Sequence, residues 1–346
     1  MSEFLRARAI LAGCIAAAAL TACGGGGGGG SSTPAPSADT PSTPANPASP
    51  TSPTTNPNPL TPSPAIPDTT PIGGAGAPLA TGNIALDGRE WINYRRSQVG
   101  MTTLTQNSFI DRAAQNHSDY QRLNNTITHD EESGKQGFTG VDVAARLTAA
   151  GYVFNTRASR AYGEVISATS NGSGQYMAEE LITAVYHRFV IFEPVFKEIG
   201  TGAATTGQGY NYFTANFTAN NGYGTGLASG QVAVWPFNGQ TAVPRNFFSD
   251  TESPDPVPDR NEVGYPISVH ANIDLTVRVN TFTVRPRGGA DMAVRLLTNA
   301  NDTHTGTSSA AIVPLAPLAA NTVYEVSFNG TVGSNAVTRA WTFTTR

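Results

Sequence analysis

Few residues in this chain could do chemistry. It has five histidines and two cysteines among 346 residues. His129, Glu164 and His187 could together bind Zn²⁺ or a similar divalent ion, because zinc accepts imidazole nitrogens and carboxylate oxygens as ligands. They come from separate segments without a His-Glu-x-x-His motif, so only a fold could bring them together. The same groups could instead hold one another by hydrogen bonds, with Glu164 orienting a neutral histidine.

Covalent or hydrolytic catalysis has less support in the sequence than binding at these side chains. No Gly-x-Ser-x-Gly nucleophile motif stands out. A hydrolase that uses a metal-bound water would need an open coordination position, which the sequence does not show. We therefore expect no enzymatic activity and no required cofactor, with a divalent metal such as zinc at His129 and His187 as an option. A metal-dependent hydrolase of peptides or envelope polymers is the alternative.

The start of the chain predicts export and a lipid anchor. Arg6 and Arg8 precede an apolar stretch at residues 9–20, and Leu-Thr-Ala-Cys follows, ending at Cys23. This order is typical of a lipoprotein signal peptide, here residues 1–23, with Cys23 lipidated. An ordinary cleaved signal with a coincidental cysteine is the alternative. A second such motif, ending at Cys14, leaves almost no apolar stretch before it.

Residues 24–82 are expected to form a disordered tether. A glycine run is followed by Pro, Ser and Thr with almost no large apolar residue, so the segment cannot bury enough surface to offset its chain entropy. Gly24 follows the predicted lipidated cysteine, which favours the outer membrane or cell surface. We expect the membrane as a partner through the lipid anchor. The net charge of −4 and the lack of a basic run argue against nucleic acid.

The remainder divides by composition into helical and strand-rich parts. Helices are expected at about 87–100, where Asp87 caps and Gly100 ends the helix, and at about 107–123, 141–150 and 175–186. Strands are expected at 197–202 and 210–217. In the second helix, His117 lies on the apolar stripe and is interpreted as a packed histidine. Helices followed by paired strands indicate an α+β fold.

Seven short motifs occur in the order found in the bacterial branch of the CAP (SCP/PR-1-like) superfamily, which this segment resembles. They are Asn93 to Arg96, Ala113 to His117, Thr128 to Glu131, Arg146 to Tyr152, Gly163 to Ile166, Tyr186 to Arg188, and Glu198 to Gly202. The resemblance implies a CAP domain at residues 83–228 with an α-β-α sandwich. Two departures are Val165 in place of an Asn and Leu181 near the place of a Trp.

The resemblance also implies a ligand-binding groove lined by two His and two Glu. His129, Glu164 and His187 match three of these positions. The fourth falls at Ala184, and Glu180 is the nearest acidic candidate. His117 would lie beside the groove. The expected ligand is a small apolar molecule, a lipid or a cell-envelope component.

Three further charged residues flank the predicted groove. Asp130 and Glu131 are interpreted as solvated loop acids, and Arg146 as structural. The alternative for Asp130 and Glu131 is that they support the groove residues from behind.

The C-terminal part is expected to be an all-β sandwich at residues 255–346, joined by a connecting segment at 229–254. Tyr324, Val326 and Phe328 alternate and would face the core, and a turn is expected at Asn329-Gly330. The spacing Leu318-x-x-x-Thr322-x-Tyr324 resembles a signature of bacterial Ig-like modules. Such a module would support the first domain or contact other surface molecules, which makes a structural adhesin a further alternative.

Overall fold

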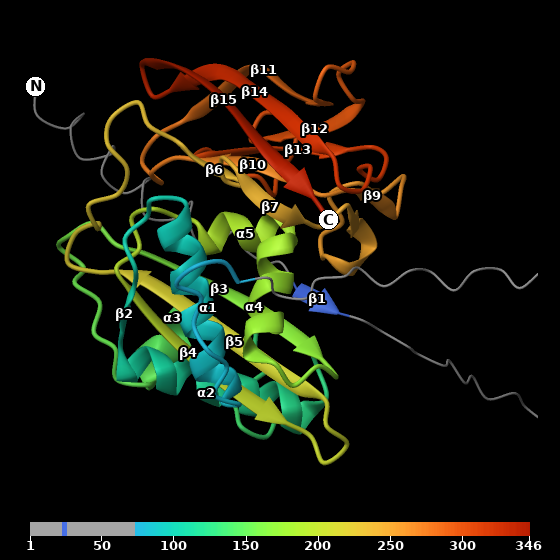
Figure 1. Cartoon of the computed structure of the whole chain (residues 1–346). Helices are drawn as coiled ribbons and strands as arrows, with labels where there is room; N and C mark the ends of the chain where they lie inside the picture. Colours follow the sequence, from blue (N-terminus) through green and yellow to red (C-terminus); the bar gives the residue numbers. More distant parts are fainter. Residues whose placement is uncertain (1–22, 26–72) are drawn as a thin grey trace, which may run out of the picture. The chain divides into compact units, whose positions relative to one another are not determined.

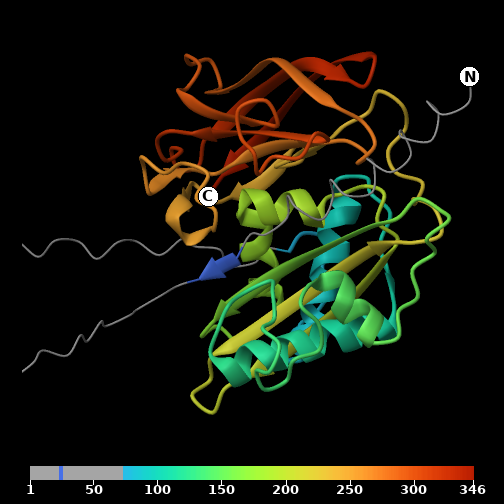
Figure 2. The same ribbon diagram turned by 180° about the vertical axis from the view of Figure 1, so that it is seen from behind.

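The computed structural model describes residues 23–25 and 73–346 (Figures 1 and 2). Residues 1–22 of the predicted signal peptide and most of the predicted tether therefore lie outside the described residues. All described residues belong to one compact unit. Within this part of the chain, no helix has both the length and the hydropathy needed to cross a bilayer.

The first part is built on a mixed five-stranded sheet with the strand order β1-β3-β5-β4-β2. The three long central strands pair antiparallel, and both short outer strands pair parallel to their neighbours. The strands are β1 (Cys23–Gly25), β2 (Thr105–Gln106), β3 (Ala161–Thr169), β4 (Glu198–Thr205) and β5 (Asn211–Ala219). The helices are α1 (Ile84–Gln98), α2 (Ser108–Asn124), α3 (Val143–Ala149), α4 (Gly174–Thr183) and α5 (Val185–Ile191).

Helices cover both faces of this sheet (Figures 1 and 2). Successive side chains of a strand point to opposite faces, and β3 shows the consequence. Val165 is buried in the cluster that includes Met177 and Leu181 of α4. Tyr162, on the opposite face, packs with the cluster of α2 and α3 residues. The α-β-α arrangement confirms the predicted fold class for this part.

Two helix ends show how local chemistry sets the boundaries. The side chain of Asn83, not Asp87, accepts the capping hydrogen bond of α1 from Leu86. Asp87 lies one turn into the helix, where its carboxylate accepts hydrogen bonds from the backbone of Thr81 and Gly82. The prediction of Asp87 as the cap was therefore wrong. Gly100, just beyond α1, has φ +77°, as expected for a glycine that ends a helix.

The helix expected at 175–186 is interrupted. Ala184 is extended, with φ −69° and ψ 122°, and separates α4 from α5. The arginine that follows His187 is fully buried, and its guanidinium donates to the carbonyls of Ile182 and Thr183 at the end of α4. Arg188 thus satisfies backbone acceptors that the break leaves open.

The second part contains two four-stranded sheets, ordered β12-β13-β10-β6 and β11-β14-β15-β7, and a hairpin of β8 and β9. The bounds are β6 (Ala233–Trp235), β7 (Gln240–Val243), β8 (Asn246–Phe248), η1 (Ser249–Thr251), β9 (Glu262–Gly264), β10 (Ile267–His270), β11 (Val277–Pro286), β12 (Val294–Thr298), β13 (Ser309–Pro314), β14 (Val323–Val332) and β15 (Asn335–Thr345). The segment expected to connect two domains, 229–254, contributes β6 and β7, one strand to each sheet.

The alternation predicted for β14 is present, because Tyr324, Val326 and Phe328 are all buried. The turn predicted at Asn329-Gly330 is wrong: both residues pair with β15, and the strand continues to Val332. The chain turns instead at Gly333, which has φ +59°. Hydrogen bonding of β14 to β15 along the whole length of β14 therefore outweighs the local preference of Asn-Gly for a turn.

The hydrophobic core is continuous between the two parts. One cluster of buried residues contains Trp91 of α1, Phe192 after α5 and Phe343 of β15. Phe192 and Trp235 of β6 meet with ring centroids 5.2 Å apart. The two parts therefore share buried apolar surface.

Candidate functional site

Glu164 is the centre of a buried polar network on the face of the sheet covered by α2 and α3. Its Oε1 accepts a hydrogen bond from His129 Nδ1 at 2.9 Å. Both of its oxygens lie 2.8 Å from one guanidinium nitrogen of Arg146, on α3. The other terminal nitrogen of Arg146 donates to the carbonyl of His129 at 2.7 Å. The structure thus brings together two of the predicted groove residues and fixes both through Arg146, whose predicted structural role fits this geometry.

His117 of α2 extends the network. Its Nε2 lies 3.8 Å from Glu164 and 2.8 Å from the carbonyl of Thr128, and its Nδ1 lies 2.8 Å from Glu131. Acceptors thus face both ring nitrogens, an arrangement that a doubly protonated imidazolium satisfies in full. His117 is completely buried, as its place on the apolar stripe predicted.

Glu131 is not the solvated loop acid that the sequence suggested. It is only 3% exposed, and besides His117 it binds the backbone of Thr139 and Gly140. Asp130, beside it, is exposed as expected. The loop that carries both acids turns back so that Val141 accepts a hydrogen bond from the Glu131 amide. Sequence spacing gave no signal for this, because the partners come from a loop without regular structure.

The charges of this network are set by opposing effects on pKa. Burial would raise the pKa of Glu164, but the guanidinium of Arg146, the imidazole of His117 and the hydrogen bond from His129 outweigh it and hold the pKa well below its usual range. Burial likewise opposes ionisation of Glu131, but hydrogen bonds from His117 and Thr139 leave its pKa lowered. Both carboxylates are therefore ionised at neutral pH.

His187 has a different partner, which sequence reasoning missed. Its Nδ1 lies 3.1 Å from Oε1 of Glu252, a buried residue just after η1. The carboxylate of Glu252 also accepts hydrogen bonds from the backbone amides of Val185, Tyr186 and His187 at 2.8, 2.6 and 3.2 Å. Glu252 lies in the segment 229–254, where the sequence predicts only a connection, and nothing in the local pattern marks it.

Glu180 contacts neither the Glu164 network nor the pair of His187 and Glu252. Its Oε1 accepts a hydrogen bond from Ser167 at 2.9 Å. On β3, Ser167 and Glu164 differ by an odd number of residues, so they point to opposite faces of the sheet. Burial raises the pKa of Glu180 to about 7, against a smaller lowering by the Ser167 hydrogen bond. The structure therefore does not bring Glu180 together with Glu164.

The residues implied as metal ligands fit a cation poorly. Within the described residues, no group of three His, Cys, Asp or Glu side chains is placed to hold a metal ion. His129 and His187 bind two different carboxylates, those of Glu164 and Glu252. Both oxygens of Glu164 also accept hydrogen bonds from Arg146. A zinc ion here would have to displace a buried guanidinium that repels it. We therefore derive no step through a metal.

A groove opens next to the Glu164 network. It has a volume of about 480 Å³ and is lined mainly by apolar side chains. We call it the aromatic groove; its lining residues are Ala144, Thr148, Gly151, Tyr152, Val153, Phe154, Thr156, Arg160 and Tyr162. Tyr162 lies two residues before Glu164 on the same face of β3, and α3 carries Arg146 between Ala144 and Thr148. The lining contains none of the five predicted groove residues.

Aromatic rings form one wall of this groove. Phe154 lies with its ring centroid 5.1 Å from that of Tyr152 and 5.7 Å from that of Tyr162. Val153 is 82% exposed, and Arg160 is also exposed. The arrangement offers an apolar surface with one cation at its edge.

Comparison with known proteins agrees with this architecture. The family model of CAP, the cysteine-rich secretory protein family, matches residues 90–217. Among curated protein sequences, none matches the chain significantly. The matched range contains all of the Glu164 network as well as His187, but not Glu252.

Solved structures similar to this chain include an extracellular protein containing an SCP domain from Bacillus anthracis, at 21% identity, with a TM-score of 0.33 and 39% of each chain covered. An outer surface protein from Borrelia burgdorferi has 15% identity and a TM-score of 0.32, with 38% of this chain and 89% of that chain covered. The venom allergen-like protein 4 of Schistosoma mansoni has 12% identity and a TM-score of 0.28, with 41% of this chain and 90% of that chain covered. The match thus spans about two fifths of the Bacillus protein. On the strength of the family model and the α-β-α architecture, residues 90–217 of this chain are a CAP domain.

Proposed function

We propose that this chain is a lipid-anchored cell-surface binding protein whose CAP domain takes a small apolar ligand in the aromatic groove. The observation that carries the proposal is the groove itself. Its volume of about 480 Å³ lies within the range of small-molecule sites, roughly 300–1,000 Å³. Its aromatic wall and the exposed Val153 would lose contact with water when an apolar ligand binds.

The Glu164 network has a supporting role in this proposal. Both nitrogens of His117, Nδ1 of His129 and the carboxylate of Glu164 form hydrogen bonds within the protein, which suits a rigid wall better than a reacting centre. Arg146 fixes α3 to β3, and these two elements carry part of the groove lining. The network would therefore hold the elements of the groove in place without contacting the ligand itself.

The proposed location follows from the first residues of the chain. The signal-like stretch and Cys23 predict export and lipidation. Two or more acyl chains would anchor the protein stably, because each buried CH₂ contributes about 0.8 kcal/mol. Mass spectrometry of Cys23 in membranes of the producing cell would detect the lipid directly.

Binding can be tested with cis-parinaric acid, a fluorescent fatty acid whose carboxylate could approach Arg160. We expect fluorescence enhancement that saturates with the full chain and is weakened at least tenfold by Val153→Asp. Leu79→Asp is the matched control, because Leu79 is 90% exposed and does not line the groove. Equal binding by both variants, or none by the unaltered protein, would refute the proposal.

A further inference from the structure

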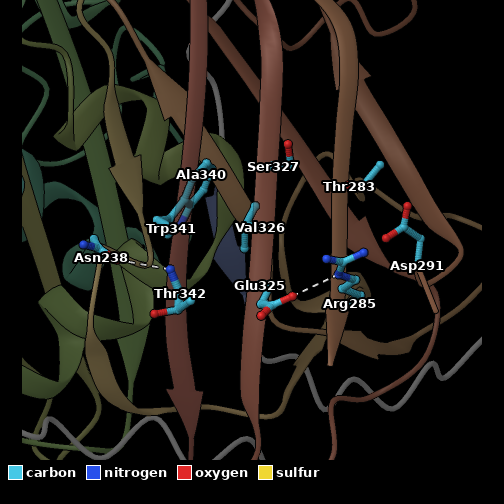
Figure 3. Close-up of a pocket in the computed structure, with 10 residues that line it drawn as sticks. All are labelled: Asn238, Thr283, Arg285, Asp291, Glu325, Val326, Ser327, Ala340, Trp341 and Thr342. Carbon is cyan, nitrogen blue, oxygen red and sulfur yellow. Dashed lines mark hydrogen bonds and ion pairs between the residues drawn. The ribbon is translucent and has the colours of Figure 1, made fainter. Parts of the chain in front are cut away.

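The second part of the chain carries a concavity of a different chemical character (Figure 3). It lies on the solvent face of the sheet formed by β11, β14, β15 and β7 and has a volume of about 590 Å³. We call it the polar concavity; its lining residues are Asn238, Thr283, Arg285, Asp291, Glu325, Val326, Ser327, Ala340, Trp341 and Thr342. It is remote in sequence from the CAP domain and independent of the function proposed above.

The register of the strands builds its floor. In one row across the sheet, Arg285 pairs with Glu325, and Glu325 pairs with Thr342. In the next row on the same face, Thr283 pairs with Ser327, and Ser327 pairs with Ala340. The side chains of the second row are all short, so the concavity is deepest there. The longer side chains of the first row project further from the sheet.

Two loops form the walls. Asn238, between β6 and β7, accepts a hydrogen bond from the Thr342 amide at 3.2 Å, which fixes that loop against β15. Asp291, between β11 and β12, is exposed on the opposite side. Figure 3 shows these two residues flanking the strands, with Ser327 and Thr283 between them.

The charges around the concavity are balanced, and part of them are paired with one another. Arg285 Nε donates to Glu325 at 3.0 Å, and Arg287 Nε lies 3.5 Å from the other oxygen of Glu325. Two cations thus accompany two carboxylates, those of Glu325 and Asp291, around the concavity. No single sign of charge dominates, so neither an anion nor a cation is favoured by long-range attraction.

A ligand for this surface must both donate and accept hydrogen bonds at several points. Asp291, Asn238 and Thr342 offer acceptors, while the hydroxyls of Ser327 and Thr283 and the guanidinium of Arg285 offer donors. Vicinal hydroxyl groups on a ring meet this demand, because each hydroxyl donates once and accepts once or twice. We propose that the polar concavity is a binding site for a neutral saccharide chain.

The test uses the full chain and isothermal titration with a panel of neutral oligosaccharides of two to six hexose or N-acetylhexosamine units. We expect at least one of them to bind. Ala340→Tyr should weaken that binding at least tenfold, because the new ring fills the low part of the floor. Ala336→Tyr is the matched control, since Ala336 is an exposed alanine on the same face of β15 but outside the lining.

A second variant separates binding from folding. Asp291→Ala changes an exposed wall residue that is outside the hydrophobic core, so it should leave the thermal unfolding midpoint unchanged and still weaken binding. The proposal is overturned if no oligosaccharide of the panel binds at millimolar concentration. It is equally overturned if Ala340→Tyr and Ala336→Tyr bind alike, or if inorganic phosphate competes with the saccharide.

Discussion

Arg146 and Glu164 illustrate how a buried charged pair behaves at the scale of single residues. Their side chains are at most 1% exposed and meet at 2.8 Å. Removing both charges from water is costly, and the mutual attraction offsets that cost only while both partners are present. The loss of one partner should therefore matter more than the loss of both.

Arg146→Met should destabilise the protein by about 3–5 kcal/mol, because it leaves the Glu164 carboxylate buried without its cation. The measurement is the free energy of unfolding in urea at pH 7. The double variant Arg146→Met, Glu164→Met should be more stable than this single variant. Arg157→Met, at an exposed arginine, serves as the control, with an expected change within about 0.5 kcal/mol. A double variant less stable than the single one would contradict this account.

The lowered pKa of Glu164 predicts an acid dependence of stability. Below about pH 5 the unfolded chain binds more protons than the folded protein, in which Glu164 stays ionised, so stability falls as the pH falls. Glu164→Gln removes this contribution. The urea midpoints of the two proteins should thus differ most near pH 7 and converge toward pH 3. Glu132→Gln, at a glutamate whose side chain is 78% exposed, should show no such convergence.

At single residues, sequence indicated a contact only where two motifs carried both partners. The resemblance pointed to His129 and Glu164, and the structure brings these two into contact. Local sequence gave no sign that Glu131 is buried, because that burial depends on how an irregular loop folds back. It also missed Glu252, because a contact across 65 residues leaves no local pattern.

At the scale of elements, the glycines of β4 show why a strand and a helix can approach so closely. A Cβ added at Gly202 would lie 2.2 Å from the backbone nitrogen of Gln115 in α2, and one at Gly200 would lie 2.2 Å from that of Asp111. Both glycines belong to the family motif at residues 198–202. The close packing of α2 against the strand explains why both positions are glycine, since no side chain would fit there.

Gly202→Ala should therefore destabilise the protein by about 1–3 kcal/mol or more, because rigid backbone atoms must move apart. Gly207→Ala is the control, since an added Cβ there meets nothing within 4 Å and the position lacks a positive φ. Thermal unfolding of both variants would measure the difference. A similar loss in both would show that the close contact with α2 is not the cause.

Long amphipathic elements were the easiest to predict, and breaks within them the hardest. The stripe of α2 gave a helix at about 107–123, and the structure has Ser108–Asn124. No proline or glycine marks the break at Ala184. It depends on Arg188 and Glu252, which form hydrogen bonds with the backbone groups that the break leaves without a helical partner on either side. Such tertiary compensation cannot be read from the helix's own sequence.

At the scale of the whole molecule, buried polar contacts join the CAP domain to the second part. Arg188 donates to the carbonyl of Pro266 at 2.8 Å, and Glu193 accepts a hydrogen bond from the amide of Ile273 at 3.1 Å. Burial raises the pKa of Glu193 to about 8, although hydrogen bonds from Val195 and Ile273 act against that rise. These contacts accompany the shared hydrophobic cluster.

The continuous core predicts that both parts unfold together, in a single calorimetric transition. Glu252→Ala should lower the midpoint of that whole transition. It removes the carboxylate that accepts four hydrogen bonds, three from backbone amides at the start of α5 and one from the His187 ring, and leaves these buried donors without an acceptor. Asp250→Ala, at an exposed acid of η1, should leave it nearly unchanged. Two separate transitions, with only one of them shifted by Glu252→Ala, would show that the parts fold independently. A single shifted transition would mean that contacts in the second part set the stability of the CAP domain.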